Sequence, residues 1–187
     1  MTSVARARLV RAAAFGLVAV VWFATAEVVT HAGQPVGQNA QVWVPSGIAM
    51  GIVALTGRWN ALGVLLGAGV YWYTRGAGVT TSILVAAVDA AEALFGAYLI
   101  ARFTQVGHGL TRVRDVLGLL AAVLVVTVAS AVAVTVVMIA AGHVPVSTAC
   151  LQAPAWWWAH FSADVIIVPL MLVFAARGIR HLAAGAR

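Results

Sequence analysis

The chain has 187 residues, of which 63% are hydrophobic and only 9% are charged, and its mean hydropathy is +1.01. So few polar residues cannot cover the surface of a water-soluble globule, and the composition therefore predicts an integral membrane protein. The formal charge of +6 comes from eleven arginines at the ends of apolar runs, which favours anionic lipid headgroups as their partners and argues against nucleic acid.

Six apolar runs follow one another along the chain. Because about 20 apolar residues cross a bilayer as a helix, the long runs predict transmembrane helices, and the two short runs between them, which meet at Gly57-Arg58, predict a short helical hairpin. The expected spans are 9–31, 46–57, 59–74, 80–103, 115–141 and 153–176. We therefore expect residues 1–187 to form one domain, an all-α polytopic membrane bundle of about six helices.

The arginines predict how this bundle is oriented. With the N-terminus in the cytoplasm, ten of the eleven arginines fall in inner connections and only Arg75 falls outside. The ten are Arg6, Arg8, Arg11, Arg58, Arg102, Arg112, Arg114, Arg177, Arg180 and Arg187. Since inner loops are rich in basic residues, we expect both termini to be cytoplasmic and the membrane to be a bacterial plasma membrane.

The first run also has the features of a signal peptide, because arginines precede it and an Ala-Thr-Ala sequence lies near its end. A retained first helix is favoured over cleavage, since that helix then has the rest of the bundle as its partner.

Small and helix-starting residues mark the short hairpin. Pro45-Ser46-Gly47 indicates a helix start at which the Ser46 hydroxyl caps the first turn. Two pairs of glycines with a spacing of four, Gly47/Gly51 and Gly63/Gly67, allow helix backbones to approach closely in lipid. We interpret them as packing positions in preference to a dimer interface.

Carboxylates occur inside two of the long runs. At 1.5 Å per residue, Asp89 and Glu92 lie ~14 and ~18 Å into their helix, near the middle of the bilayer. Their spacing of three puts both on one helix face. Asp164 lies in the last run with His160 one turn before it on the same face. A charged Asp at this depth costs ~2.5 to 3.5 kcal/mol, and no arginine stands near enough in the sequence to offset it.

Two interpretations of these buried acids remain open. In one, the acids are protonated and form a structural polar cluster; in the other, they bind a proton, a small organic cation or a metal ion. His160, Asp164 and Glu92 have the chemistry of metal ligands, although a histidine beside a carboxylate is also the ordinary way to satisfy two buried polar groups. Trp157, in the run Trp156-Trp157-Trp158, is an aromatic anchor that can also close a cation pocket.

Enzyme chemistry is not expected. The sequence has no nucleophile paired with a base, no glycine-rich phosphate loop and no HExxH motif. The ligand-binding candidates are Asp89, Glu92, His160, Asp164, Trp157 and Ser46, and the sequence names no cofactor.

Several of these segments, in order, resemble the MASE1 family of bacterial integral membrane sensor domains. They are VWVPSGIAMGIVALTGRWNALGVLLGAGV (42–70), AAVDAAEALFGAYLIARF, RVRDVLGLL (112–120) and WWWAHFSADVIIVPLML (156–172). In that family a WPPSGIA-like segment starts a short helix, an NTLEA-like segment carries a buried glutamate and a WWxGD segment precedes a proline. By resemblance, the WPPSGIA-like segment is matched by Trp43, Pro45, Ser46 and Gly47. The buried glutamate is matched by Glu92, with Asp89 in place of the asparagine. The WWxGD segment and its proline are matched by Trp156, Trp157 and Pro169.

The chain departs from the family pattern in two ways. His160 stands where the family has an aspartate, with Asp164 one turn further on, so the chemistry of the site differs. Family members also usually carry more helices and then an output module, whereas this sequence ends at Arg187. The resemblance implies a sensor that binds a small molecule, cation or proton and signals to a separate cytoplasmic protein.

A rival interpretation is the substrate-binding membrane component of an uptake transporter for cationic or vitamin-like molecules, acting with a transporter partner. A third is a purely structural membrane protein.

Overall fold

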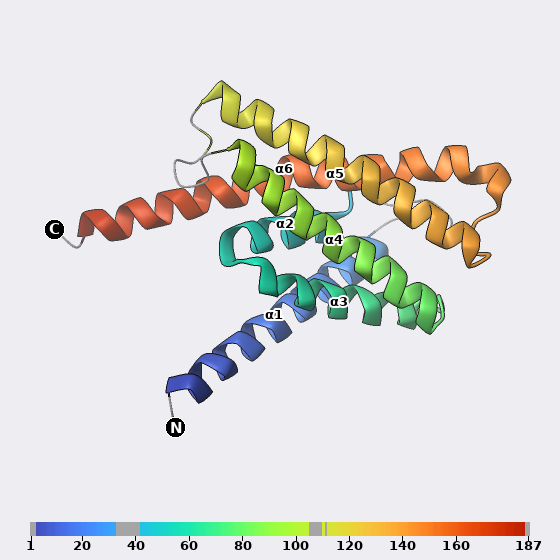
Figure 1. The fold of residues 1–187 in the computed structure, drawn as a ribbon, viewed down its shortest axis with the longest axis horizontal. Coiled ribbons are helices and arrows are strands. Elements are labelled where there is room, and N and C mark those ends of the chain that lie inside the picture. Colours follow the sequence, from blue (N-terminus) through green and yellow to red (C-terminus); the bar gives the residue numbers. More distant parts are fainter. Residues whose placement is uncertain (1–2, 33–41, 105–109, 111, 186–187) are drawn as a thin grey trace.

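The protein is an all-helical bundle (Figure 1). The computed structural model describes residues 3–32, 42–104, 110 and 112–185, with side chains described within residues 11–176. Its elements are α1 (Ser3–His31), α2 (Val44–Thr56), η1 (Arg58–Asn60), α3 (Ala61–Thr74), α4 (Val79–Phe103), α5 (Val113–Ala140), η3 (Val146–Thr148) and α6 (Ala149–Gly185). The predicted fold class, an all-α membrane bundle, is confirmed.

Four segments of the described chain are long and apolar enough to cross a membrane: Arg11–His31, Val79–Phe103, Val113–Ala140 and Val146–Ala176. The 13 and 14 residues of α2 and α3 rise only ~20 Å each, less than the ~30 Å of a hydrocarbon core. They meet at Gly57, whose φ of 106° is a backbone conformation that glycine adopts without strain. The protein is thus a multi-pass membrane protein with two short helices inside it.

The predicted cap at the start of α2 is wrong. Helix α2 begins at Val44, with Pro45 in its first turn, so Ser46 already lies inside the helix. Its hydroxyl donates a hydrogen bond back to the carbonyl oxygen of Trp43, at 2.9 Å, and caps no backbone N–H. Proline is tolerated there because the first N–H groups of a helix have no intrahelical acceptor.

Helices α2 and α4 occupy the centre of the bundle. Helix α4 packs against α2, α3 and α5, and α2 packs against α6, α4 and α1, while α2 and α3 barely touch each other. Figure 1 shows α4 and α5 running side by side and α6 extending beyond the other helices toward the C-terminus. The short helices are therefore held by the long helices and not by each other.

The glycine pairs are contact points between helices of this chain. A Cβ atom at Gly47 would lie 2.8 Å from the Ala163 carbonyl oxygen of α6, and one at Gly51 would overlap Met171. The second pair faces α1, where a Cβ atom at Gly67 would lie 2.5 Å from the Ala19 oxygen. The glycines thus let α2 press on α6 and α3 on α1 within one chain.

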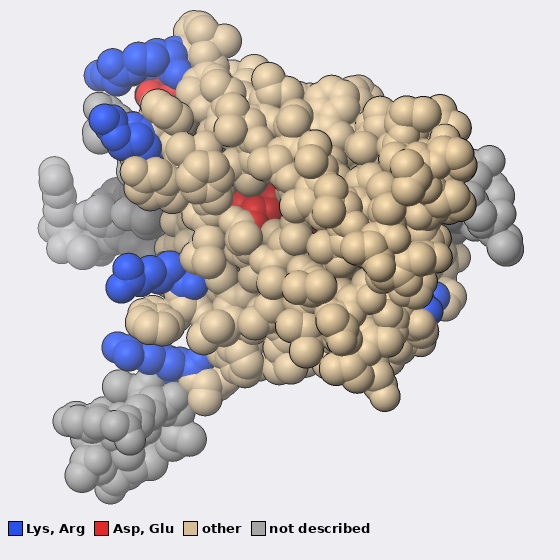
Figure 2. Space-filling model, turned by 45° about the vertical axis from the view of Figure 1, so that its right-hand side comes forward, with Lys and Arg blue, Asp and Glu red and all other residues tan. Residues whose placement is uncertain are grey.

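Charge is segregated between the two ends of the bundle (Figure 2). One side, which we call the arginine-rich end, carries Arg58, Arg102, Arg112 and Arg114 near helix ends and Arg11 in the N-terminal part of α1. Arg75 follows α3 on the other side. Figure 2 shows an uncharged surface between the ends, interrupted by a small acidic patch. The other five arginines, Arg6, Arg8, Arg177, Arg180 and Arg187, lie outside the described side chains.

Candidate functional site

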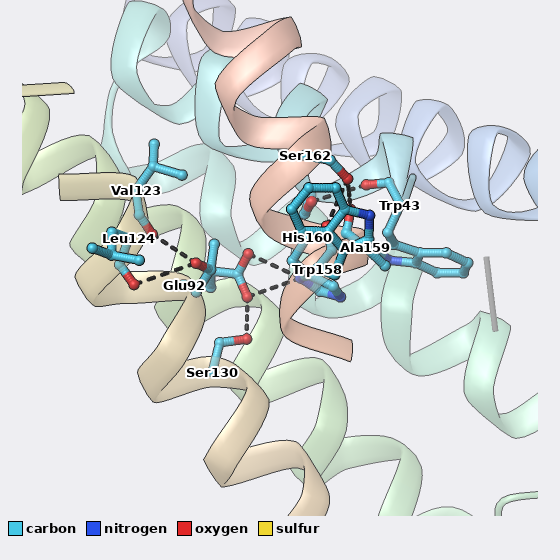
Figure 3. Close-up of polar contacts among 11 residues, drawn as sticks. Trp43, Glu92, Val123, Leu124, Ser130, Trp158, Ala159, His160 and Ser162 are labelled. Atoms are coloured by element: carbon cyan, nitrogen blue, oxygen red, sulfur yellow. Dashed lines mark hydrogen bonds and ion pairs between the residues drawn. The ribbon is translucent and has the colours of Figure 1, made fainter. Parts of the chain in front are cut away.

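Two long helices, α4 and α6, and the short helix α2 carry the predicted polar residues in the interior of the bundle. Figure 3 shows the surroundings of two of them, Glu92 and His160. Asp89 and Glu92 of α4 are 6% and 4% exposed, His160 and Asp164 of α6 are 2% and 0% exposed, and Ser46 of α2 is 6% exposed. Electrostatic interactions join His160 to Glu92, Asp89 and Asp164. We call Asp89, Glu92, His160 and Asp164 the acidic cluster.

Glu92 is the best-satisfied member of the acidic cluster. Both of its carboxylate oxygens lie 3.0 Å from Nδ1 of His160, and the Ser130 hydroxyl of α5 donates a hydrogen bond to one of them. Figure 3 shows the carboxylate pointing between α5 and α6 toward these two partners. One glutamate therefore links α4, α5 and α6.

Aromatic rings enclose the imidazole of His160. Trp43 and Trp156 stack on it with centroid distances of 6.4 and 5.8 Å and interplanar angles of 18° and 26°. Trp72 stacks in turn on Trp156 at 5.7 Å. The backbone N–H of Trp43 donates to the Ala159 carbonyl oxygen at 2.8 Å, which fixes the start of α2 beside His160.

Asp164 is buried without a hydrogen bond. Both of its carboxylate oxygens lack a hydrogen-bond partner of good geometry in the described part of the chain, although Ser46 and Glu92 lie near it. The Ser46 hydroxyl already donates to the Trp43 carbonyl. Asp164 faces the charges of Glu92 and His160. A buried carboxylate in such surroundings is costly unless it gains a proton or a cation.

Asp89 completes the acidic cluster one turn before Glu92. It interacts electrostatically with His160 and Glu92, and the Trp72 indole lies beside it without a hydrogen bond from its nitrogen. The only ion pair that any cluster residue makes within the described residues is that between His160 and Glu92. With all three carboxyl groups ionised and the imidazole protonated, two negative charges would remain uncompensated.

Among the ring contacts of the described residues, Trp157, the aromatic candidate, does not stack on His160. Trp157 stacks on Phe161 at 5.4 Å and meets Trp158 edge-on, whereas its neighbour Trp156 is the one that stacks on His160. Neighbouring helix residues point about 100° apart, so a single-residue difference decides which indole faces the cluster.

Sequence reasoning missed Ser130 and the pairing of Trp43 and Trp156 with His160. Ser130 is a hydroxyl inside an otherwise apolar span, which is the signal that would have identified it. Nothing in the sequence gave the rotation of α5 that turns this hydroxyl toward Glu92.

The geometry gives no support to a metal centre. Among the described residues no group of three or more His, Cys, Asp or Glu side chains is arranged to hold a metal ion. Three carboxyl groups and one imidazole, all titratable, share a site that is almost fully buried.

Comparison with known proteins gives one match. The family model named MASE1 matches residues 8–181, nearly the whole chain. No curated protein and no solved structure matches the sequence.

Proposed function

The chain belongs to the MASE1 family of membrane-associated sensory domains, and from this premise we propose that its acidic cluster is the sensory site and that its ligand is the proton. The cluster would take up or release protons as the pH changes, and the packing of the helices around it would change in response. On this proposal the protein acts by binding and carries out no catalysis.

One observation carries the proposal: Asp164 is fully buried and both of its oxygens lack a hydrogen-bond partner within the described structure. The imidazole that would balance it is already engaged by Glu92. Such a carboxyl group is stable at this depth when it carries a proton. Proton uptake and release at Asp164 therefore have a direct effect on the energy of the bundle.

The packing around His160 favours a proton over a larger ligand. The rings of Trp43 and Trp156 both stack on the imidazole. Asp164 and Glu92 are 0% and 4% exposed, so an organic cation would have to move neighbouring side chains to reach them, whereas a proton needs no cavity.

The contacts of His160 also offer a path to the rest of the molecule. His160 is bonded to α4 through Glu92 and stacked on Trp43 at the start of α2. Ala163 of α6, three residues after His160, lies against Gly47 of α2. A change of charge in the cluster would shift the packing of α2 on α6, in the way a ligand shifts a pre-existing equilibrium.

We place the output of this shift at the arginine-rich end, which we propose faces the cytoplasm of a bacterial cell because basic residues concentrate on that side of a plasma membrane. A separate cytoplasmic protein would read the change there.

The test is an infrared titration of the whole protein in lipid nanodiscs, in which protonated and ionised carboxyl groups absorb separately. Wild-type protein and the control Glu27→Gln are expected to show a buried-carboxyl signal that changes with pH, because Glu27 is partly exposed and lies outside the cluster. Asp164→Asn and Glu92→Gln are expected to lose part of that change. Circular dichroism establishes that each variant is folded.

Two results would overturn the proposal. One is an unchanged carboxyl titration in folded Asp164→Asn and Glu92→Gln. The other is uptake of a labelled organic cation into vesicles that contain the protein and an energising partner, together with loss of that uptake in Asp164→Asn. This result would assign the cluster to a transport component.

A further inference from the structure

A second site lies at the arginine-rich end, well away from the acidic cluster along α4. A pocket of about 780 Å³ opens between the end of α4 and the start of α5. Two arginines, Arg102 and Arg114, line it together with Thr104, Phe103, Leu117 and Gly118. The pocket thus combines two guanidinium groups with an apolar wall.

The helices meet closely behind this pocket. A Cβ atom at Gly118 would lie 2.9 Å from the carbonyl oxygen of Phe103, so a side chain there would push α5 away from α4. The glycine therefore keeps the two helix ends together and brings Arg102 of one helix near Arg114 of the other.

The positive charges of the pocket are uncompensated. Neither Arg102 nor Arg114 forms an ion pair with a carboxylate of the described residues. The acid next in sequence, Asp115, is 1% exposed and does not line the pocket. Two guanidinium groups that share a pocket without a carboxylate are suited to bind an anion, and phosphate is the anion that their planar donors fit best.

The two helix ends reinforce this preference. The negative end of α4 is covered, because the backbone N–H and the hydroxyl of Thr104 both donate to the Ile100 carbonyl, at 2.8 and 2.7 Å. At the start of α5 the N-cap residue Arg112 makes no side-chain cap, and Asp115 is the acidic residue of the first turn. The first N–H groups of a helix have no intrahelical acceptor and attract anions.

We propose that this pocket binds the phosphate of an anionic phospholipid, with Arg102 and Arg114 on the phosphate and Phe103 and Leu117 beside the acyl chains. A lipid fits better than a free phosphate compound because the pocket joins a basic helix end to exposed apolar side chains of membrane helices: Phe103 is 50% and Leu117 is 58% exposed. Figure 2 shows basic side chains gathered along this end of the molecule.

The test measures binding of fluorescent phosphatidylglycerol to the full chain in zwitterionic nanodiscs. An arginine at an anionic surface contributes about fivefold to binding, so the double variant Arg102→Gln/Arg114→Gln is expected to weaken binding roughly 30-fold. The matched control Arg11→Gln/Arg58→Gln removes the same charge from exposed arginines of the same end that do not line the pocket, and it is expected to retain binding.

Three results would overturn the proposal. The first is an equal loss in the two double variants, which would mean general surface attraction. The second is unchanged binding in a folded Arg102→Gln/Arg114→Gln protein. The third is displacement of the lipid by millimolar inorganic phosphate, which would identify a soluble phosphate compound as the occupant. Circular dichroism of both variants separates lost binding from lost fold.

Discussion

Among the residues that the structure describes, the acids Glu27 and Glu92 form ion pairs of similar length in opposite surroundings. At the end of the bundle away from most arginines, Glu27 of α1 accepts from Arg75 at 2.9 Å and lies 3.4 Å from Nδ1 of His31. At the centre, Glu92 lies 3.0 Å from His160. The Glu27 and Arg75 side chains are 29% and 33% exposed, whereas both members of the central pair are 2% exposed.

This difference in exposure decides what each pair does. Water can replace either partner of the Glu27–Arg75 pair, so that pair adds little stability. The Glu92 side chain is almost fully buried, and the loss of His160 leaves its carboxylate without a counter-charge inside the membrane. An ion pair therefore contributes little to stability at Glu27 and much more at Glu92.

The largest expected effect comes from breaking the central pair. His160→Leu is expected to lower the free energy of unfolding by about 3–5 kcal/mol, because Glu92 stays buried without its partner. Unfolding of the whole protein in mixed micelles with increasing denaturing detergent measures the loss. The same substitution at exposed His143 is the control and is expected to cost little. Equal losses at the two histidines would contradict the comparison.

An intermediate effect is expected where α1 and α3 touch, the same two helices that the Glu27–Arg75 pair joins. Gly67→Ala puts a methyl group against the Ala19 carbonyl oxygen and is expected to cost about 1–3 kcal/mol, as overpacking does. The same change at Gly16, which has nothing within 4 Å of its Cβ position, is expected to be neutral or stabilising. Denaturing-detergent titrations of both variants compare them, and a Gly67→Ala protein as stable as Gly16→Ala would show that α1 and α3 are not in close contact.

The smallest effect is expected from the exposed pair. Arg75→Gln is expected to lower the free energy of unfolding by about 0.2–1 kcal/mol, since both partners are partly hydrated. Added salt is expected to shrink the difference between variant and wild type, because it screens exposed charges. A loss as large as that of His160→Leu, insensitive to salt, would mean that Glu27 and Arg75 are shielded from water.

Much of the fold was predictable because it depends on local sequence. The lengths of the apolar runs gave membrane helices, and the short runs on either side of Gly57 gave the two short helices. The glycine pairs indicated close packing, and the structure puts them against α6 and α1. The family resemblance, confirmed by the match over residues 8–181, rested on motifs that are likewise contiguous in the sequence.

The sequence by itself determined that Asp89, Glu92, His160 and Asp164 would lie deep in apolar helices, because depth follows from counting residues along a helix. Only the tertiary structure decided their partners. Ser130 and His160 are 38 and 68 residues from Glu92, and their contacts depend on how α5 and α6 are rotated about their axes. A rotation of one residue separates Trp156, which stacks on His160, from Trp157, which does not. Helix periodicity defines the faces of each helix, but the packing of all the helices together selects which faces meet.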